Sequence, residues 1–124
     1  MYKDLSDSEM LILNLLWESK RKLSAAEIME HFQERKWKMT TVSTFLSRMI
    51  DKKVIQSERK GRKFLYYPTV TQKELKRRKA WDFVSRNYSS VKDFILALDD
   101  SHISEKEAEE IERILSKGEE KIST

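Results

Sequence analysis

The stretch KMTTVSTFLSRMIDK, residues 38–52, predicts a helix whose two faces differ in chemistry. Its apolar residues recur at the spacing of one stripe on a helix of 3.6 residues per turn. These residues are Val42, Phe45, Leu46, Met49 and Ile50. The opposite face carries short hydroxyl side chains and one guanidinium: Thr40, Thr41, Ser43, Thr44, Ser47 and Arg48. Hydroxyl and β-branched residues form helices less well than Glu, Lys or Gln. Their concentration on this face therefore suggests that they serve a function.

Entry into the major groove of DNA is one such reason. Short hydroxyls can approach base edges, threonine methyls can touch thymine methyls, and flanking basic groups can reach phosphates. The alternative is a tolerated polar surface on a small helix, and the helix by itself favours neither interpretation.

Positive charge is concentrated in the middle of the chain. The 124 residues carry a net charge of +4. Residues 1–34 hold 4 basic and 7 acidic side chains, residues 35–79 hold 15 and 3, and residues 80–124 hold 6 and 11. A basic middle third predicts a polyanionic partner at that third, with a chance block of surface charge as the alternative.

Composition restricts the class of protein. With 39% hydrophobic residues, 37% charged residues, 2 Gly and 1 Pro, the chain has the composition of a mostly helical protein. The absence of cysteine excludes disulfides and thiolate metal sites. No run approaches the roughly 18 apolar residues of a membrane span, and the first residues do not resemble a signal peptide. We therefore expect a cytoplasmic protein without membrane insertion.

Capping boxes mark most of the expected helix starts. In such a box the side chain of a Ser or Thr accepts a hydrogen bond from the backbone N–H of the residue three places later. That residue is a Glu, and its side chain accepts one from the backbone N–H of the Ser or Thr. The pairs are Ser6 with Glu9, Ser24 with Glu27, Thr71 with Glu74, and Ser104 with Glu107. Together with the helix described above, they predict helices that begin near residues 7, 25, 39–41, 72 and 105.

The hydrophobic period changes from 3.6 to 2 after residue 53. Residues 54–59 and 62–68 are β-rich runs joined by Lys60-Gly61, where glycine supplies the positive φ of a tight hairpin. Its tip carries Arg59, Lys60, Arg62 and Lys63, which either contact DNA or discourage edge-to-edge pairing of sheets. Three helices followed by a basic hairpin is the order of a winged helix-turn-helix, whose third helix enters the major groove.

The last third predicts a dimerisation region. Its apolar residues recur at alternating steps of three and four, as in a coiled-coil seam: Trp81, Val84, Tyr88, Val91, Ile95 and Leu98. Residues 87–90, NYSS, predict a break in this helix, and a last helix adds Ile111, Ile114 and Leu115. Pairing with a second copy would complete a core and place two third helices about one DNA turn apart. Folding back onto the N-terminal domain is the alternative.

The expected fold is therefore mainly α, with two domains. Residues 1–70 form a winged helix-turn-helix DNA-binding domain, and residues 71–124 form a helical dimerisation domain. Trp37, which precedes the third helix, is expected to fill the core rather than to bind a ligand.

No catalytic constellation is present in the sequence. His31 and His102 lack a cysteine, a serine constellation or a metal-ligand partner at helical spacing, so we expect both at the surface. The adjacent acidic pairs Asp99-Asp100 and Glu109-Glu110 point in different directions on a solvated face. We expect neither an enzyme nor a metal or cofactor site.

Three motifs in order resemble the penicillinase repressor family of the BlaI, MecI and CopY type. They are LSDSE at residues 5–9 with LLW at 15–17, TVSTFLSRM at 41–49, and GRKFLYYP at 61–68, and the match runs over nearly the whole chain. The resemblance implies a homodimeric winged-helix repressor on a palindromic operator, with residues 40, 41, 43 and 44 nearest the bases. It also implies that the C-terminal helices interlock as the dimerisation domain.

Three departures from the family pattern matter. Lys38-Met39-Thr40 stands where the family usually has Ser-Pro-Lys, so we expect a different base preference. The C-terminal cysteine cluster of copper-responsive members is absent. Antibiotic-responsive members are cleaved at an Asn-Phe bond by a membrane-bound sensor protease, and Ala97-Leu98 stands at the aligned position here. These residues do not support cleavage at that bond, and the sensor protease is left as an alternative partner.

The predicted function is that of a sequence-specific DNA-binding transcriptional repressor, acting as a homodimer on a palindromic operator. The predicted DNA interface consists of Lys38, Thr40, Thr41, Ser43, Thr44, Ser47, Arg48, Arg59, Lys60, Arg62 and Lys63. The alternative is a winged-helix protein-interaction module that does not bind DNA, which a mobility shift would distinguish.

Overall fold

The computed structural model describes residues 4–98 and 104–123, with side chains of the last helix described as far as residue 114. The chain divides into two compact units, the first ending at Thr71 and the second beginning at Gln72. Each unit is considered by itself.

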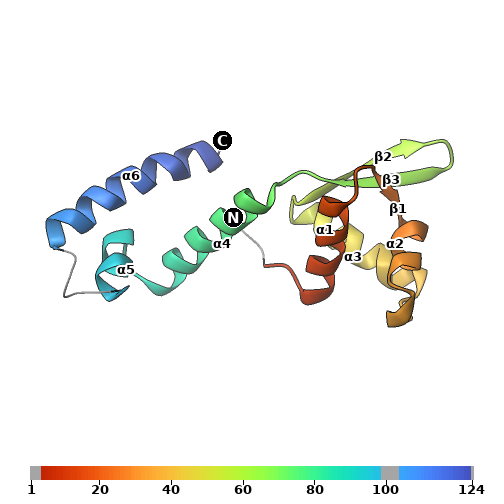
Figure 1. Cartoon of the computed structure of the whole chain (residues 1–124), viewed down its shortest axis with the longest axis horizontal. Coiled ribbons are helices and arrows are strands. Elements are labelled where there is room, and N and C mark those ends of the chain that lie inside the picture. The colour runs from red at the N-terminus through yellow and green to blue at the C-terminus, as the bar shows by residue number, and fades with distance from the viewer. Residues whose placement is uncertain (1–3, 99–103, 124) are drawn as a thin grey trace. The chain divides into compact units, whose positions relative to one another are not determined.

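The first unit contains three helices and a small sheet. Its helices are α1 (Asp7–Glu18), α2 (Ala25–His31) and α3 (Met39–Asp51), with a short 3-10 helix, η1 (Gln33–Arg35), before α3. Its strands are β1 (Leu23–Ser24), β2 (Ile55–Lys60) and β3 (Lys63–Pro68). Figure 1 shows the three helices gathered at one end of the β2–β3 hairpin, whose tip extends beyond them.

Local sequence explains where α1 and α2 begin. The Ser6 hydroxyl accepts a hydrogen bond from the Glu9 backbone N–H, and the Glu9 carboxylate accepts one from the Ser6 N–H. Ser24 and Glu27 form the same reciprocal pair at the start of α2. The predicted starts near residues 7 and 25 are confirmed, because each box satisfies two N–H groups that the helix itself leaves free.

The sheet is antiparallel with strand order β1-β3-β2. The hairpin register runs from Ile55 opposite Pro68 to Lys60 opposite Lys63, which confirms the predicted hairpin within one residue at its ends. Sequence reasoning missed β1, because two residues are too short to show a period of 2.

The core of the first unit lies between the helices and the sheet. Its fully buried apolar side chains, at most 2% exposed, come from α1, α2, α3 and residues 54–55, where β2 begins: Ile12, Leu13, Leu16, Ile28, Val42, Leu46, Met49, Val54 and Ile55. The Trp17 indole N–H donates to the Val70 carbonyl at 2.7 Å, which fastens the end of the sheet to α1. The apolar stripe predicted for residues 38–52 therefore faces inward.

The second unit consists of α4 (Gln72–Asn87), α5 (Val91–Leu98) and α6 (Glu105–Ser123). The break predicted at residues 87–90 lies at residues 88–90 and separates α4 from α5, and Ser104 with Glu107 forms the predicted capping box of α6. A small core joins Val84, Val91, Ile95 and Ala108. The winged-helix fold with a mainly helical remainder agrees with the predicted fold class.

Candidate nucleic-acid interface

Helix α3 presents its hydroxyl face to solvent. Val42, Leu46 and Met49 on the opposite face are at most 1% exposed, so the helix is fixed on one side by the core. The predicted interface residues Lys38, Thr40, Ser43, Thr44, Ser47 and Arg48 are all exposed, and Thr41 is half-buried. The structure thus leaves a polar surface of short side chains along the whole length of α3.

One hydroxyl on this face is engaged within the helix. The Thr44 hydroxyl donates to the Thr40 carbonyl, four residues earlier, at 2.9 Å. Such bonds between a side chain and the preceding turn are common for threonine in helices. Because the Thr44 hydroxyl donates its proton to Thr40, it can only accept a further hydrogen bond, and its methyl group is available for an apolar contact.

The start of α3 differs from the starts of α1 and α2. Lys38 occupies the N-cap position, no side chain caps the helix, and its first turn holds no acidic residue. The residue before it in the chain, Trp37, is half-buried, with its ring 5.2 Å from Phe45 and 5.1 Å from Phe32 between ring centroids. These aromatic contacts hold the connection between α2 and α3 in place. Trp37, which was expected to fill the core, is only half-buried and packs against these two rings.

An ion pair fastens the other end of α3 to the start of α1. Lys52, the C-cap residue of α3, donates to Glu9 Oε1 at 2.6 Å and to the Asp4 carbonyl at 2.8 Å. The Glu9 side chain is 1% exposed and that of Lys52 is 18% exposed. Burial acts to raise the pKa of the Glu9 carboxyl, but the hydrogen bonds from Lys52 and from the Ser6 backbone outweigh it and lower the pKa.

The β2–β3 hairpin, called the wing below, carries its cations at the tip. Arg59, Lys60, Arg62 and Lys63 are all exposed. Gly61 has a φ of +66°, which favours glycine at the turn, and the Arg59 Nε–H donates to the Gly61 carbonyl at 3.2 Å. A tight, internally bonded turn thus brings together the four cations that were predicted as wing residues.

Two exposed apolar side chains accompany these polar residues. Met39 at the start of α3 is 40% exposed and Phe64 on the wing is 49% exposed. Sequence reasoning did not include either in the interface. The alternation of side chains along residues 63–68 could have indicated Phe64. It places Phe64 on the face of the strand that packs against the core further along, but at the end of the strand that lies outside the core.

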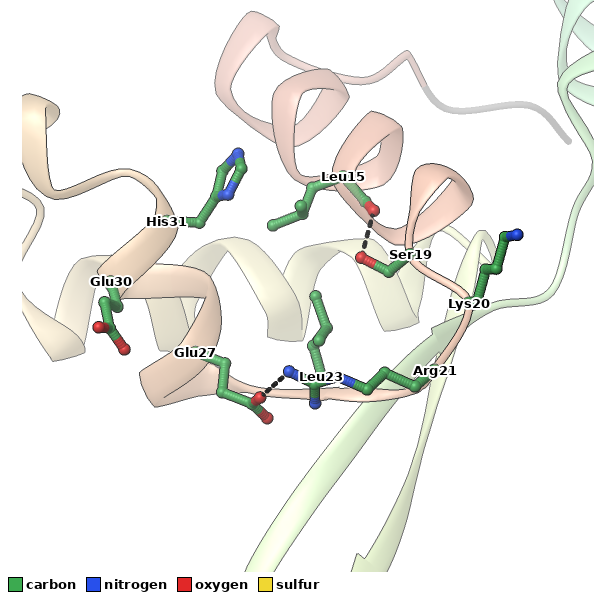
Figure 2. Close-up of a pocket in the computed structure, with 8 residues that line it drawn as sticks. All are labelled: Leu15, Ser19, Lys20, Arg21, Leu23, Glu27, Glu30 and His31. Atoms are coloured by element: carbon green, nitrogen blue, oxygen red, sulfur yellow. Dashed lines mark hydrogen bonds and ion pairs between the residues drawn. The ribbon is translucent and has the colours of Figure 1, made fainter.

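A shallow, open pocket of about 600 Å³ lies elsewhere in the first unit, as Figure 2 shows. Its lining residues come from α1, α2 and the segment between them: Leu15, Ser19, Lys20, Arg21, Leu23, Glu27, Glu30 and His31. The Arg21 guanidinium lies 2.5 Å from Glu27 Oε2, and its hydrogen bond, together with the one from the Ser24 backbone, lowers the pKa of that carboxyl to about 2. The pocket mixes both signs of charge and includes no residue of α3.

Of the two histidines, the structure describes His31. His31 is exposed and contacts the edge of the Phe32 ring, with 4.8 Å between centroids. His102 lies outside the described residues, as do Asp99 and Asp100. Over residues 4–98 and 104–123, no three His, Cys, Asp or Glu side chains cluster closely enough to hold a metal ion.

The residues predicted for dimerisation fall into two groups. Val84, Val91 and Ile95 are buried in the core of the second unit, with Trp81 and Tyr88 half-buried against it. Leu98, Ile111 and Ile114 are exposed by 67%, 38% and 66%. Leu115 lies in α6, but its side chain is outside the described residues. The single apolar seam expected from the sequence is therefore divided between α4 and α5. Part of it is buried in the core of the second unit, and the rest is exposed.

Lys92 links α5 to α6 within this unit. Its backbone N–H donates to Glu112 Oε2 at 2.5 Å, and its ammonium lies 3.4 Å from both Glu105 Oε1 and Glu109 Oε1. Hydrogen bonds from Lys92 to Glu109 and Glu105 raise the pKa of the lysine.

In the part of the chain that the structure describes, no helix is both long and apolar enough to span a membrane.

Comparison with known proteins gives one consistent family. The family model described as penicillinase repressor matches residues 5–117. The methicillin resistance regulatory protein MecI of Mammaliicoccus sciuri is 29% identical over 120 residues, which cover 92% of this chain and 94% of MecI. The penicillinase repressor of Bacillus licheniformis is 25% identical over 113 residues, covering 90% of this chain and 88% of the relative.

The first unit also resembles a solved domain. The solution structure of the DNA binding domain of the repressor BlaI aligns with a TM-score of 0.51 and 25% identity, covering 58% of this chain and 90% of that domain. The match of the family model extends through both units and includes α3 and the wing. This protein therefore belongs to the penicillinase repressor family, a family of transcriptional repressors and not of enzymes.

Proposed function

We propose that this protein is a homodimeric transcriptional repressor that binds a palindromic DNA operator through α3 and the wing. One observation carries the proposal: a single unit exposes both the hydroxyl face of α3 and the four cations at the tip of the wing. Double-stranded DNA fits both surfaces, because its phosphates attract the cations and its base edges accept and donate hydrogen bonds.

The predicted interface residues take two roles in this proposal. Thr40, Ser43, Thr44 and Ser47 face the base edges in the major groove, and Thr41 supports them from its half-buried position. The cations at the ends of α3 and on the wing hold the phosphates, which fixes the register without reading sequence. These cations are Lys38, Arg48, Arg59, Lys60, Arg62 and Lys63.

We propose that the second unit forms the dimer. Leu98, Ile111 and Ile114 expose apolar surface that a second copy would cover, whereas Val84, Val91 and Ile95 form the internal core behind it. A two-fold dimer presents two copies of α3, and two half-sites about one helical turn of DNA apart suit that symmetry.

Two further statements belong to the same proposal. A repressor acts where its operator is, so we place this one in the cytoplasm. We also propose a membrane-bound sensor protease as a partner, with cleavage at Ala97-Leu98. Both of these side chains are exposed at the end of α5 in the single chain, so a protease would reach the bond when the dimer that covers Leu98 has separated. Purified protein incubated with the candidate sensor and examined by mass spectrometry would give fragments that end at residue 97.

A binding experiment tests the proposed function. Purified protein is used to select duplexes from a random library, and the selected duplex is titrated in mobility shifts over a range of salt concentrations. We expect the logarithm of the affinity to fall linearly with the logarithm of salt, and Lys63→Ala to reduce the slope by about 0.9. Lys106→Ala, a matched loss of one exposed charge in the second unit, leaves the slope unchanged. No selected duplex, or equal slopes for both variants, would overturn the proposal.

A further inference from the structure

Large apolar side chains on the surface of the first unit are confined to the proposed DNA interface. Over residues 4–71, the large hydrophobic side chains that are clearly exposed are those of Met39, at 40%, and Phe64, at 49%. One lies at the start of α3 and the other on the wing. An isolated exposed apolar residue needs no explanation, but a phenylalanine at the tip of a cationic hairpin has an unusual setting.

The register of the sheet defines the position of Phe64. Phe64 is paired with Arg59, and two residues further on Tyr66 is paired with both Ser57 and Leu23. Because side chains alternate along a strand, Phe64 shares a face with Tyr66 and with the buried Leu23. Strand β1 pairs only with Leu65 and Tyr66, so Phe64 lies beyond the end of β1.

The wing presents this ring rigidly. Phe64 stands two residues from the end of the turn, which Arg59 closes through its hydrogen bond to the Gly61 carbonyl. Lys60 and Lys63 form the last pair of the ladder, so the backbone on both sides of the turn is hydrogen-bonded. A backbone held in this way loses little further freedom when a ligand covers the ring that it carries, which favours binding.

The charges around Phe64 indicate the kind of ligand. Its nearest neighbours along the hairpin include Arg59, Arg62 and Lys63, all exposed, whereas the acidic residue of the wing, Glu58, is paired with Lys22 at 2.7 Å. An apolar protein groove would have to bury these cations near the ring at considerable cost. The minor groove of DNA offers apolar deoxyribose C–H groups on its walls and phosphates at its edges, which suits the ring and the cations together.

We propose that Phe64 is an apolar DNA contact of the wing, with its ring against the deoxyribose wall of the minor groove next to the major groove that α3 enters. This inference rests on the proposed function. Strand β2 begins four residues after the last residue of α3, and in a winged helix-turn-helix the wing lies beside the groove that the third helix enters. Phe64 then adds affinity that does not depend on salt, beside cations whose contribution does.

The expected effect follows from the exposed area of the ring. A phenylalanine side chain buries about 200 Å² at most, so about 100 Å² of this one is available. If DNA covers half of that area, about 25 cal/mol per Å² predicts an affinity about tenfold higher than without the ring. Phe64→Ala should therefore lower the affinity about tenfold, and the slope of affinity against salt should stay that of the wild type.

Two variants of similar size separate contact from structure. Phe64→Leu keeps an apolar side chain and should keep most of the affinity, whereas Phe64→Gln replaces it with a polar one and should lose about as much as Phe64→Ala. The full-length protein and the duplex it selects from a random library are used, at equal protein concentration. Thermal unfolding of each variant checks that it is folded at the assay temperature. Lys63→Ala gives the opposite signature, a changed slope.

The outcomes distinguish this inference from the proposed function. If the wild type selects no duplex, the proposed function fails and the inference with it. If the wild type binds and Phe64→Gln binds equally well, the inference fails alone and the proposed function stands. A loss for Phe64→Gln and Phe64→Ala that Phe64→Leu largely avoids, with unchanged salt slopes, supports it.

Discussion

Removal of the Lys52 ammonium should destabilise the first unit strongly, because it leaves a buried carboxylate without its main partner. In Lys52→Met, Glu9 Oε1 keeps only its bond from the Ser6 N–H at 2.8 Å, and Glu9 Oε2 already has no hydrogen-bond partner. Breaking a buried ion pair from one side costs about 3–5 kcal/mol. Since Lys52 is 18% exposed, we expect the lower end, about 3 kcal/mol.

The pH dependence of this loss has a definite sign. In the wild type the pKa of Glu9 is lowered, so its stabilisation is present above the unfolded pKa, near 4.5, and is lost as the pH falls through the folded pKa. In Lys52→Met, burial raises the pKa of Glu9 above the unfolded value. The variant therefore becomes relatively more stable as the pH falls from about 7 to about 4, and the difference in unfolding free energy from the wild type shrinks.

Thermal unfolding, followed by circular dichroism at equal protein concentration, measures both effects. About 3 kcal/mol corresponds to a fall in Tm of about 15 °C for a unit of this size. Lys53→Met makes the same chemical change at the exposed neighbour and should stay within about 0.5 kcal/mol of the wild type. In the double variant Glu9→Met with Lys52→Met, most of the stability should return. A loss below about 1 kcal/mol, or one that does not depend on pH, would refute the assignment of this pair.

Three further predictions concern α3 and its ends. Lys38→Ser supplies the side-chain N-cap that α3 lacks, so it should stabilise the unit by about 1 kcal/mol and raise its Tm by about 4–8 °C. The same variant loses one cation, so the slope of DNA affinity against salt should fall by about 0.9. A Tm that does not rise would contradict the statement that the start of α3 is uncapped. The Thr44 hydroxyl donates to the Thr40 carbonyl, so we expect the Thr44 methyl group to make the contact with DNA. In mobility shifts, Thr44→Val should keep the operator affinity and Thr44→Ser should lower it about fourfold. The reverse order would show that the hydroxyl contacts the bases instead. Lys53 has a φ of 61°, so Lys53→Gly should raise the unfolding free energy by about 0.5 kcal/mol in urea denaturation, whereas Lys53→Ala should give no gain.

Much of the fold was predictable because local and global signals agree. The capping boxes at Ser6 and Ser24 and the change of period after residue 53 each depend on residues close together in the chain, and each element appears where expected. The exposed face of α3 was also predictable, since burying Val42, Leu46 and Met49 fixes the direction of every other residue on the helix.

The remaining features depend on packing between distant segments. The sequence around Glu9 predicts only a capping residue. Lys52, which also donates to the Glu9 carboxylate, is 43 residues away, so no local pattern could indicate this bond. Strand β1 exists because its two residues meet β3, and the exposure of Phe64 follows from where β1 ends. The division of the predicted seam into a core and an exposed part likewise follows from the contact of Ala108 with Val84 and Ile95.

A footprint on the selected operator tests the central claim most directly, because it shows which groove each element enters. With full-length protein, we predict two half-sites about one helical turn apart, each with guanine N7 atoms protected in the major groove by α3 and deoxyribose protected in the adjacent minor groove by the wing. Arg62→Ala should weaken protection on all duplexes. A footprint without two-fold symmetry, or one that leaves the major groove fully reactive, would contradict the account.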